Sequence, residues 1–166
     1  MEVVIVRHGP AEDRNPSRWP DDQKRPLTPD GIKSTRKAAK GLAALRPAAD
    51  KIVTSPALRA YATAEIVRDV LKVRSSLETW SELEPDTPPG PILERLQRFS
   101  RRRGLIVVGH EPTLGELLGL AVTGESVPIA RFSKAGMAAM AFPREPRAGA
   151  AEIVWVMTRK QLERFA

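Results

Sequence analysis

The sequence contains no cysteine, and it has only two histidines in 166 residues. The lack of cysteine excludes disulfides, thiolate zinc sites and a cysteine nucleophile. Any imidazole chemistry must therefore use His8, His110 or both. No stretch approaches the roughly 18 consecutive apolar residues that a membrane helix needs, and the apolar run at residues 3–6 is too short for a signal peptide. We therefore expect a soluble, cytoplasmic protein without a membrane partner.

Acidic residues are fewer than basic ones. The chain has 27 Lys and Arg against 20 Asp and Glu, a formal charge of +7. Such an excess can attract anions such as phosphorylated substrates or nucleic acid. Stacking on bases would require more aromatic residues than the three Trp, one Tyr and four Phe present here. The charge therefore favours a solvated, arginine-rich surface, and we do not expect nucleic-acid binding.

The order of apolar runs predicts an α/β fold. A chain of 166 residues suits one domain, which we expect to span residues 1–166. Short apolar runs at residues 3–6, 52–54 and 105–108 predict buried strands, and a helical pattern follows each run. This alternation predicts a three-layer sandwich with a mainly parallel central sheet and helices on both faces. Two further strands, near residues 137–142 and 152–157, predict a hairpin or an edge pair.

The first two helices have recognisable starts. Thr28 is a predicted N-cap with Pro29 at the first helical position, and Pro56 marks a second helix start. The polar segment 9–27 between the first strand and the first helix is a long loop of the kind that usually carries function. The apolar stripes expected to face the core are Ile32, Ala39, Leu42 and Leu45; Leu58, Ala62, Ile66 and Val70; Ile92, Leu93, Leu96 and Phe99; and Leu114, Leu117, Leu118 and Ala121.

Histidine or arginine follows each of three predicted strands. His8 comes directly after the first strand, and His110 follows the strand at 105–108 after one glycine. Arg59 lies in the first turn of the helix that follows the strand at 52–54. In sheets of this kind, functional sites form at the carboxyl ends of the strands. We therefore expect these side chains to converge at one edge of the sheet.

These residue types suit phosphoryl transfer through a side chain. Such transfer needs an unprotonated nucleophile and cationic donors around the phosphoryl oxygens. The imidazole of His8 has an ordinary pKa of about 6.5, and Gly9 would let a main-chain carbonyl approach to fix its tautomer. Arg7 and Arg59 carry planar guanidinium groups suited to phosphate, and a protonated His110 would add a further donor.

The same residues fall in motifs that resemble those of the histidine phosphatase (phosphoglycerate mutase-like) superfamily. Arg7-His8-Gly9 resembles the family signature, residues 55–64 (SPALRAYATA) resemble the second motif, and residues 109–112 (GHEP) resemble the third. The motifs follow the family order over residues 1 to 122. The resemblance implies that His8 is the phosphorylated nucleophile and that Arg7, Arg59 and His110 line the phosphate pocket. It implies no metal and no organic cofactor.

Within the superfamily, the short chain is most similar to the SixA-type phosphohistidine phosphatases. The sugar-phosphate mutases typically continue Arg-His-Gly with Glu and then Ser or Thr, whereas this chain continues with Pro10-Ala11-Glu12. We therefore expect hydrolysis of a phosphohistidine, on a protein, or of a small phosphomonoester. Two alternatives stay open: a phosphate-dependent binding or regulatory module without turnover, and a phosphoglycerate-type mutase.

The leaving group decides whether a general acid is needed. A departing alkoxide requires a proton in the transition state, whereas a departing imidazole is far less basic. By resemblance, Glu82 lies where many relatives carry a catalytic glutamate, and we predict it as the acid. Glu84 and Glu111 stay open as alternatives. The sequence does not indicate the physiological substrate or the oligomeric state.

Overall fold

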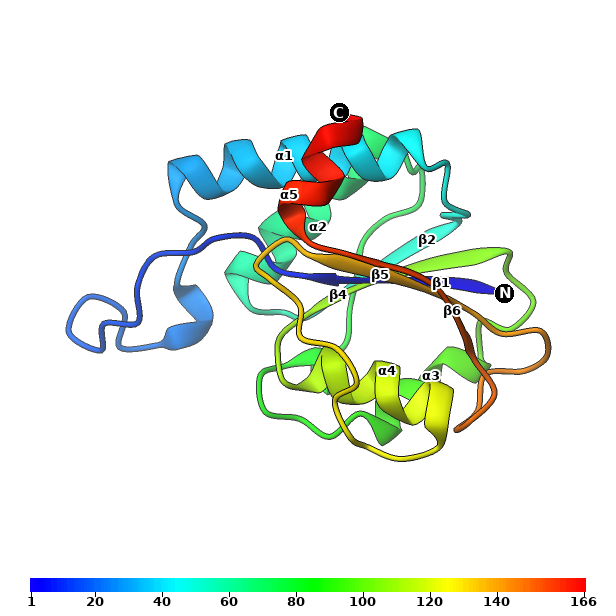
Figure 1. Ribbon diagram of the computed structural model, residues 1–166. Helices are drawn as coiled ribbons and strands as arrows, with labels where there is room; N and C mark the ends of the chain where they lie inside the picture. The colour runs from blue at the N-terminus through cyan, green and yellow to red at the C-terminus, as the bar shows by residue number, and fades with distance from the viewer.

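A six-stranded sheet separates two layers of helices in the computed structural model, which describes residues 1–166 (Figure 1). The strands are β1 (Glu2–Arg7), β2 (Lys51–Thr54), β3 (Glu78–Thr79), β4 (Gly104–Gly109), β5 (Met137–Ala141) and β6 (Glu152–Met157). Their order across the sheet is β3-β2-β4-β1-β5-β6. The first four in this order are mutually parallel, while β5 runs antiparallel to both of its neighbours, β1 and β6.

Helices cover both faces of the sheet, which confirms the predicted three-layer sandwich. They are α1 (Pro29–Ala44), α2 (Leu58–Leu71), α3 (Gly90–Gln97), α4 (Thr113–Thr123) and α5 (Arg159–Leu162), with single 3-10 turns at Asp22–Lys24, Ser81–Leu83 and Glu163–Phe165. Figure 1 shows α1, α2 and α5 on one face and α3 and α4 on the other. Side chains alternate along β1, so Val3 and Ile5 enter the core under α3 and α4 while Val4 and Val6 enter the other.

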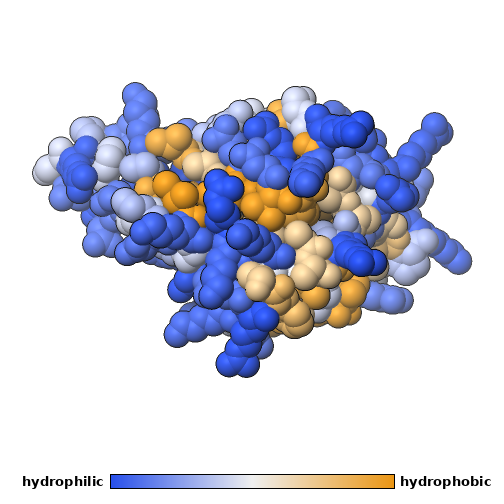
Figure 2. All heavy atoms as spheres, turned by 90° about the horizontal axis from the view of Figure 1, so that it is seen from above, coloured by the Kyte–Doolittle hydropathy of each residue, from blue (hydrophilic) through white to orange (hydrophobic).

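The surface is mainly hydrophilic, with some exposed apolar side chains. Figure 2, which looks onto the α1, α2 and α5 layer, shows hydrophilic side chains around an apolar band. The edge strand β6 leaves Ile153, Val154 and Val156 exposed. No helix combines the length and the hydropathy that crossing a bilayer requires.

The strand register brings the predicted site residues to one edge of the sheet. Arg7 at the end of β1 pairs with Gly109 at the end of β4. The His8 N–H continues this ladder by donating to the Gly109 carbonyl at 3.0 Å, and the Ser55 N–H donates to the Val108 carbonyl at the same distance. His8, Ser55 and His110 therefore start their loops side by side.

The long loop at residues 9–27 projects from this edge (Figure 1). Its two ends are held together by a bridge between Ala11 and Leu27. The predicted N-cap of α1 is confirmed, because the Thr28 hydroxyl accepts a hydrogen bond from the Gly31 N–H at 2.9 Å and Pro29 is the first helical residue. The loop is thus closed at its base by backbone pairing and by the start of a helix.

Two of the predicted apolar stripes are partly wrong. Ile32 and Leu58 are 43% and 44% exposed, and α2 begins at Leu58 rather than at Pro56. A spacing of four residues drifts by about 40° per step around an α-helix, so Leu58 and Val70 do not share one face. The buried face of α2 consists instead of Arg59, Ala60, Thr63, Ala64, Ile66 and Val67.

Candidate active site

Two histidine rings and two arginine side chains gather at the carboxyl edge of the parallel strands. The ring centroids of His8 and His110 are 5.1 Å apart. Both rings are almost fully buried, with 6% and 3% of each residue exposed, and Arg59 is equally buried at 3%. The structure therefore brings together residues that lie more than a hundred positions apart in the chain.

The hydrogen bond of His8 fixes its tautomer. Its Nδ1 lies 2.8 Å from the Gly9 carbonyl oxygen, which can only accept, so Nδ1 carries the hydrogen and Nε2 keeps a free electron pair. Burial lowers the pKa of His8 to about 4; the bond to Gly9 opposes this shift, and the charges of Arg59 and Arg7 add to it. The ring is therefore neutral at pH 7, which is the state that a nucleophile requires.

Gly9 has no room for a side chain. A Cβ at this position would collide with the Thr35 hydroxyl. The Gly9 N–H donates to the Thr63 hydroxyl at 2.9 Å, and that hydroxyl donates in turn to the Arg59 carbonyl at 2.7 Å. The segment that holds the His8 tautomer is thereby joined to the first turns of α2, which carry Arg59.

His110 is also neutral while the site holds no anion. Its Nε2 lies 2.9 Å from the Ser55 hydroxyl, which accepts from the Ala57 N–H at 3.2 Å. Burial, reinforced by the neighbouring His8 and Arg59, lowers the pKa of His110 to about 3. The protonated donor considered from the sequence would therefore require a bound anion, whose negative charge raises the pKa of a neighbouring imidazole.

Arg59 is held by the loop at residues 9–27. Its Nη1 donates to the Asp22 carbonyl at 2.8 Å, and its Nη2 forms an ion pair with the Asp22 carboxylate at 3.0 Å. Arg25 shares this carboxylate through its Nε at 2.9 Å. The Nε of Arg59 is buried and has no partner. One edge of the guanidinium group is thus anchored, and the Nε–H is left to bind something else.

Arg7, like Arg59, is held by a loop carbonyl and has an Nε–H without a partner. Its Nη1 donates to the Phe132 carbonyl at 2.6 Å, and its Nε is buried without a partner. The Nε atoms of Arg7 and Arg59 are the only ones from charged residues among the buried side-chain N and O atoms without a hydrogen-bond partner. A buried donor without a partner costs about 1–3 kcal/mol. An oxyanion that accepted from both Nε–H groups would remove this cost.

Each of the three candidate acids accepts at least one hydrogen bond in this structure. Both carboxylate oxygens of Glu82 accept from Arg95 Nη1, at 2.9 and 2.8 Å. Partial burial raises the pKa of Glu82, but hydrogen bonds from its own backbone and from Arg95 outweigh this and leave the pKa below its ordinary value. Glu84 accepts from the Gln23 amide at 3.0 Å. No hydrogen bond or ion pair joins Glu82 to the histidines, so its role as the acid stays a prediction.

Glu111 is the candidate acid that lies beside Arg7. Its Oε1 accepts from the Phe132 N–H at 2.6 Å, and its Oε2 accepts from the Gly115 N–H at 3.3 Å. Burial raises the pKa of Glu111, and the two backbone N–H groups and Arg7 oppose the shift. Glu111 lines a cavity of about 360 Å³ together with Arg7, Pro112, Pro128, Arg131 and Phe132.

Sequence reasoning missed the loop residues that anchor the arginines. The polar loop at 9–27 was expected to be functional, but nothing in it singled out Asp22 as the partner of Arg59. Phe132 contributes backbone groups, which any residue carries, so no sequence signal could have identified it. Trp80, beside the predicted acid, is fully buried and packs against Phe99 at 5.5 Å between ring centroids.

Comparisons with known proteins match both the sequence and the fold. The model of the histidine phosphatase superfamily (branch 1) matches residues 3–85. The chain is 34% identical over 131 residues to phosphohistidine phosphatase SixA of Escherichia coli (strain K12), covering 78% of this chain and 79% of that protein. An uncharacterised protein of Picosynechococcus sp. is also 34% identical, over 155 residues that cover 92% of this chain and 88% of that protein.

Solved structures extend the match over nearly the whole chain. The protein histidine phosphatase SixA complexed with tungstate superimposes with a TM-score of 0.85 at 30% identity, covering 98% of this chain and 99% of that one. An α-ribazole-5'-P phosphatase (putative) from E. coli K-12 has a TM-score of 0.75 at 16% identity, with 96% and 98% of the two chains covered. The latter similarity concerns the fold alone.

Proposed function

This chain belongs to branch 1 of the histidine phosphatase superfamily and is a phosphatase, and we propose that it hydrolyses phosphohistidine through a phosphoryl intermediate on His8. The observation that carries the proposal is the convergence of two neutral imidazoles with two guanidinium groups whose buried Nε–H donors have no partner. The similarity to SixA, which in one structure holds the tetrahedral oxyanion tungstate, supports an oxyanion at this place.

The geometry of His8 supports its role as the nucleophile. The electron pair of Nε2 attacks phosphorus while the bond from phosphorus to the leaving nitrogen breaks. The substrate ring carries a proton on its other nitrogen, so it takes the electron pair of that bond and departs as neutral imidazole. As the new bond forms, the His8 ring gains positive charge, which the Gly9 carbonyl at 2.8 Å from Nδ1 stabilises. Water then attacks the phosphorus, the bond from phosphorus to Nε2 breaks, and its electron pair returns to Nε2. Inorganic phosphate leaves with the oxygen and both protons of the water.

Arg7 and Arg59 supply the charge that this reaction needs. The transferring phosphoryl group spreads negative charge over its equatorial oxygens, and donors held in place before the reaction stabilise it best. The Nη1 groups of both arginines are tied to loop carbonyls, so their Nε–H groups are oriented in advance. His110, bonded to Ser55, can take up a proton once the phosphate is bound and add a further donor.

The surroundings of the carboxylates favour phosphohistidine over an alkyl phosphate. Glu82 is paired with Arg95, Glu84 accepts from Gln23, and Glu111 accepts two backbone N–H groups. An alkoxide leaving group would need one of them as a protonated acid, whereas a departing imidazole needs far less assistance. A site whose candidate acids are all hydrogen-bonded therefore suits the less basic leaving group.

The test compares a phosphohistidine peptide with an alkyl phosphate as substrates of the wild-type protein and of His8→Asn. We expect inorganic phosphate from wild type, faster from the peptide, and a loss of at least about 1,000-fold in the variant, because removal of a covalent nucleophile abolishes the main route. Retained turnover in a folded His8→Asn protein would exclude the proposed intermediate. A binding module would release no phosphate, and a mutase would form a phosphorylated isomer instead.

A further inference from the structure

Glu111 is tied to Arg7 through a single residue of the loop that precedes β5. On the basis of the proposed function, we propose that Glu111 is a positioning residue, which through the backbone of Phe132 holds Arg7 where its Nε–H meets the phosphoryl group. The two backbone groups of Phe132 make the connection. Its N–H donates to Glu111 Oε1 at 2.6 Å, and its carbonyl accepts from Arg7 Nη1 at 2.6 Å.

The carboxylate is itself fixed to a rigid element. Its second oxygen accepts from the N–H of Gly115, in the first turn of α4, at 3.3 Å. A negative charge beside a helix N-terminus is favourable. A Cβ at Gly115 would come within 2.6 Å of the Ala130 carbonyl and 3.0 Å of Glu111 Oε2, so the close approach of this loop to α4 requires glycine. Glu111 therefore transmits the position of α4 to the loop that holds Arg7.

Phe132 is well suited to this connection. Phe132 is 3% exposed, and its side chain belongs to the core under α3 and α4. Packing in this core therefore fixes the side chain. On the backbone side, Glu111 is the only side chain that hydrogen-bonds its N–H. Loss of the carboxylate would leave a half-buried N–H without a partner and free the carbonyl to move. Arg7 would move with that carbonyl.

The same contacts argue against proton donation by Glu111. Both oxygens accept from N–H groups, which stabilise the ionised form against the burial that raises the pKa of Glu111. An ionised Glu111 also faces the charge of Arg7, which it partly balances. A positioning residue should affect every substrate alike, whereas a general acid should matter more for a basic leaving group. This difference makes the two roles separable.

The experiment is a double-mutant cycle between Glu111 and Arg7. Glu111→Ala, Glu111→Gln, Arg7→Ala and Glu111→Ala/Arg7→Ala are assayed for kcat/KM on a phosphohistidine peptide and on an alkyl phosphate, whose alkoxide leaving group is strongly basic. Binding of orthovanadate is measured by calorimetry, and melting temperatures check that each variant folds. Glu116→Gln is the matched control, because it removes the same charge from the first turn of α4 and has no hydrogen bond to the Phe132 loop.

We expect Glu111→Ala to lower kcat/KM by about 10- to 100-fold on both substrates, the scale of a small displacement of a binding group. In the Arg7→Ala background the same change should alter kcat/KM and orthovanadate affinity by less than about twofold. Glu111→Gln, whose amide oxygen can still accept from the Phe132 N–H, should lose about fivefold or less.

Independent, multiplicative losses from the two substitutions would overturn the proposal, as would a large loss in Glu111→Gln confined to the alkyl phosphate. If Glu111→Ala does not fold, the Glu111→Gln result on the two substrates decides by itself. A wild-type protein that releases no phosphate would overturn the proposed function instead. In that case the orthovanadate cycle alone decides whether Glu111 acts through Arg7.

Discussion

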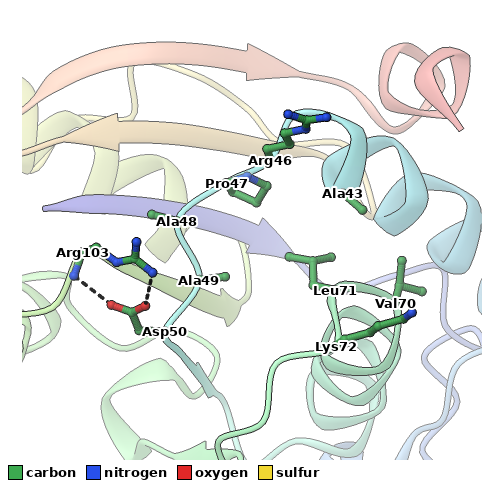
Figure 3. A pocket seen from close by; sticks show the side chains of 10 residues that line it. All are labelled: Ala43, Arg46, Pro47, Ala48, Ala49, Asp50, Val70, Leu71, Lys72 and Arg103. Carbon is green, nitrogen blue, oxygen red and sulfur yellow. Dashed lines mark hydrogen bonds and ion pairs between the residues drawn. The ribbon is translucent and has the colours of Figure 1, made fainter.

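The two ends of the parallel strands each carry a cavity and several cations, but they differ in how those cations are held. At the amino end, Figure 3 shows Arg46, Lys72 and Arg103 around a cavity of about 500 Å³, larger than the cavity of about 360 Å³ beside Arg7. Arg103 has its carboxylate partner there, because its Nη2 lies 3.5 Å from Asp50 and its N–H donates to Asp50 at 2.9 Å. At the carboxyl end, the Nε–H groups of Arg7 and Arg59 are buried and have no hydrogen-bond partner.

Helix ends explain the cations at the amino end. Lys72 is the C-cap of α2, and Arg46 lies just after the C-terminus of α1, where the helix dipole is negative. These charges already have their electrostatic partners, and solvent screens them. At the carboxyl end, burial lowers the pKa of both Arg59 and Arg7, which marks the cost of enclosing a charge there. An enclosed donor without a partner thus indicates an anion site better than cavity volume does.

The strongest test of this comparison exchanges one arginine at each end for methionine. Arg59→Met should lower kcat/KM for a phosphohistidine peptide by about 100- to 1,000-fold, the usual loss when one oxyanion donor is removed. Arg46→Met should stay within about twofold of wild type, because its charge serves a helix end. Phosphate release measures both. A comparable loss in Arg46→Met would remove the distinction between the two ends.

A second test concerns the ion pairs, Glu82 with Arg95 at the carboxyl end and Asp50 with Arg103 at the other. If Glu82 separates from Arg95 and acts as the general acid, Glu82→Gln should lower the rate of alkyl phosphate hydrolysis by about 100-fold. The rate of phosphohistidine hydrolysis should fall by no more than a few-fold. Asp50→Asn should change neither rate. Initial rates on the two substrates decide, and equal losses on both would exclude Glu82 as a general acid.

A third test uses pH, since both histidines lie at one end. The folded-state pKa values are about 4 for His8 and about 3 for His110, because of burial, whereas an unfolded histidine has about 6.5. The unfolded chain therefore binds protons below pH 6.5 that the folded protein does not, and stability present above pH 6.5 is lost as pH falls. From pH 7 to 5 the free energy of unfolding should fall by up to about 2 kcal/mol per histidine.

Urea denaturation at pH 7, 6 and 5 measures this loss, and His8→Asn/His110→Asn is the matched control. Its stability should change little over the same interval. The carboxylates whose pKa is lowered, among them Asp22 and Asp50, lose stability only as pH falls below about 4, so they do not disturb the window. A control variant that follows the wild-type curve would place the titrating groups elsewhere.

The smallest effect is expected at the amino end. Lys72 has a φ of 55°, a left-handed conformation that glycine adopts without strain. Lys72→Gly should therefore raise the free energy of unfolding by about 0.5 kcal/mol and leave kcat/KM unchanged. Arg68→Gly, inside α2, should instead lower stability by about 1 kcal/mol. Chemical denaturation of the two variants distinguishes backbone strain from a general effect of glycine.

The sequence was sufficient for the strands and for the gathering of the four site residues. The buried strands are continuous apolar runs, and the parallel-sheet rule then locates His8 and His110. Prediction from the sequence was wrong for the buried face of α2, because that face includes Arg59 and Thr63, residue types that usually lie on the surface. It could not give the neutral state of His110 either, since this depends on burial created by distant segments.

The anchoring of Arg7 and Arg59 has a consequence for how such a protein can diversify. Each guanidinium group donates a hydrogen bond to a carbonyl in a different loop. Arg7 donates to the Phe132 carbonyl and Arg59 to the Asp22 carbonyl. Surface loops are the segments that evolution lengthens, shortens and exchanges most freely. If the two arginines bind phosphate as proposed, a change in either loop that admits a new leaving group would also displace one of them. Substrate preference and phosphate affinity would then change together.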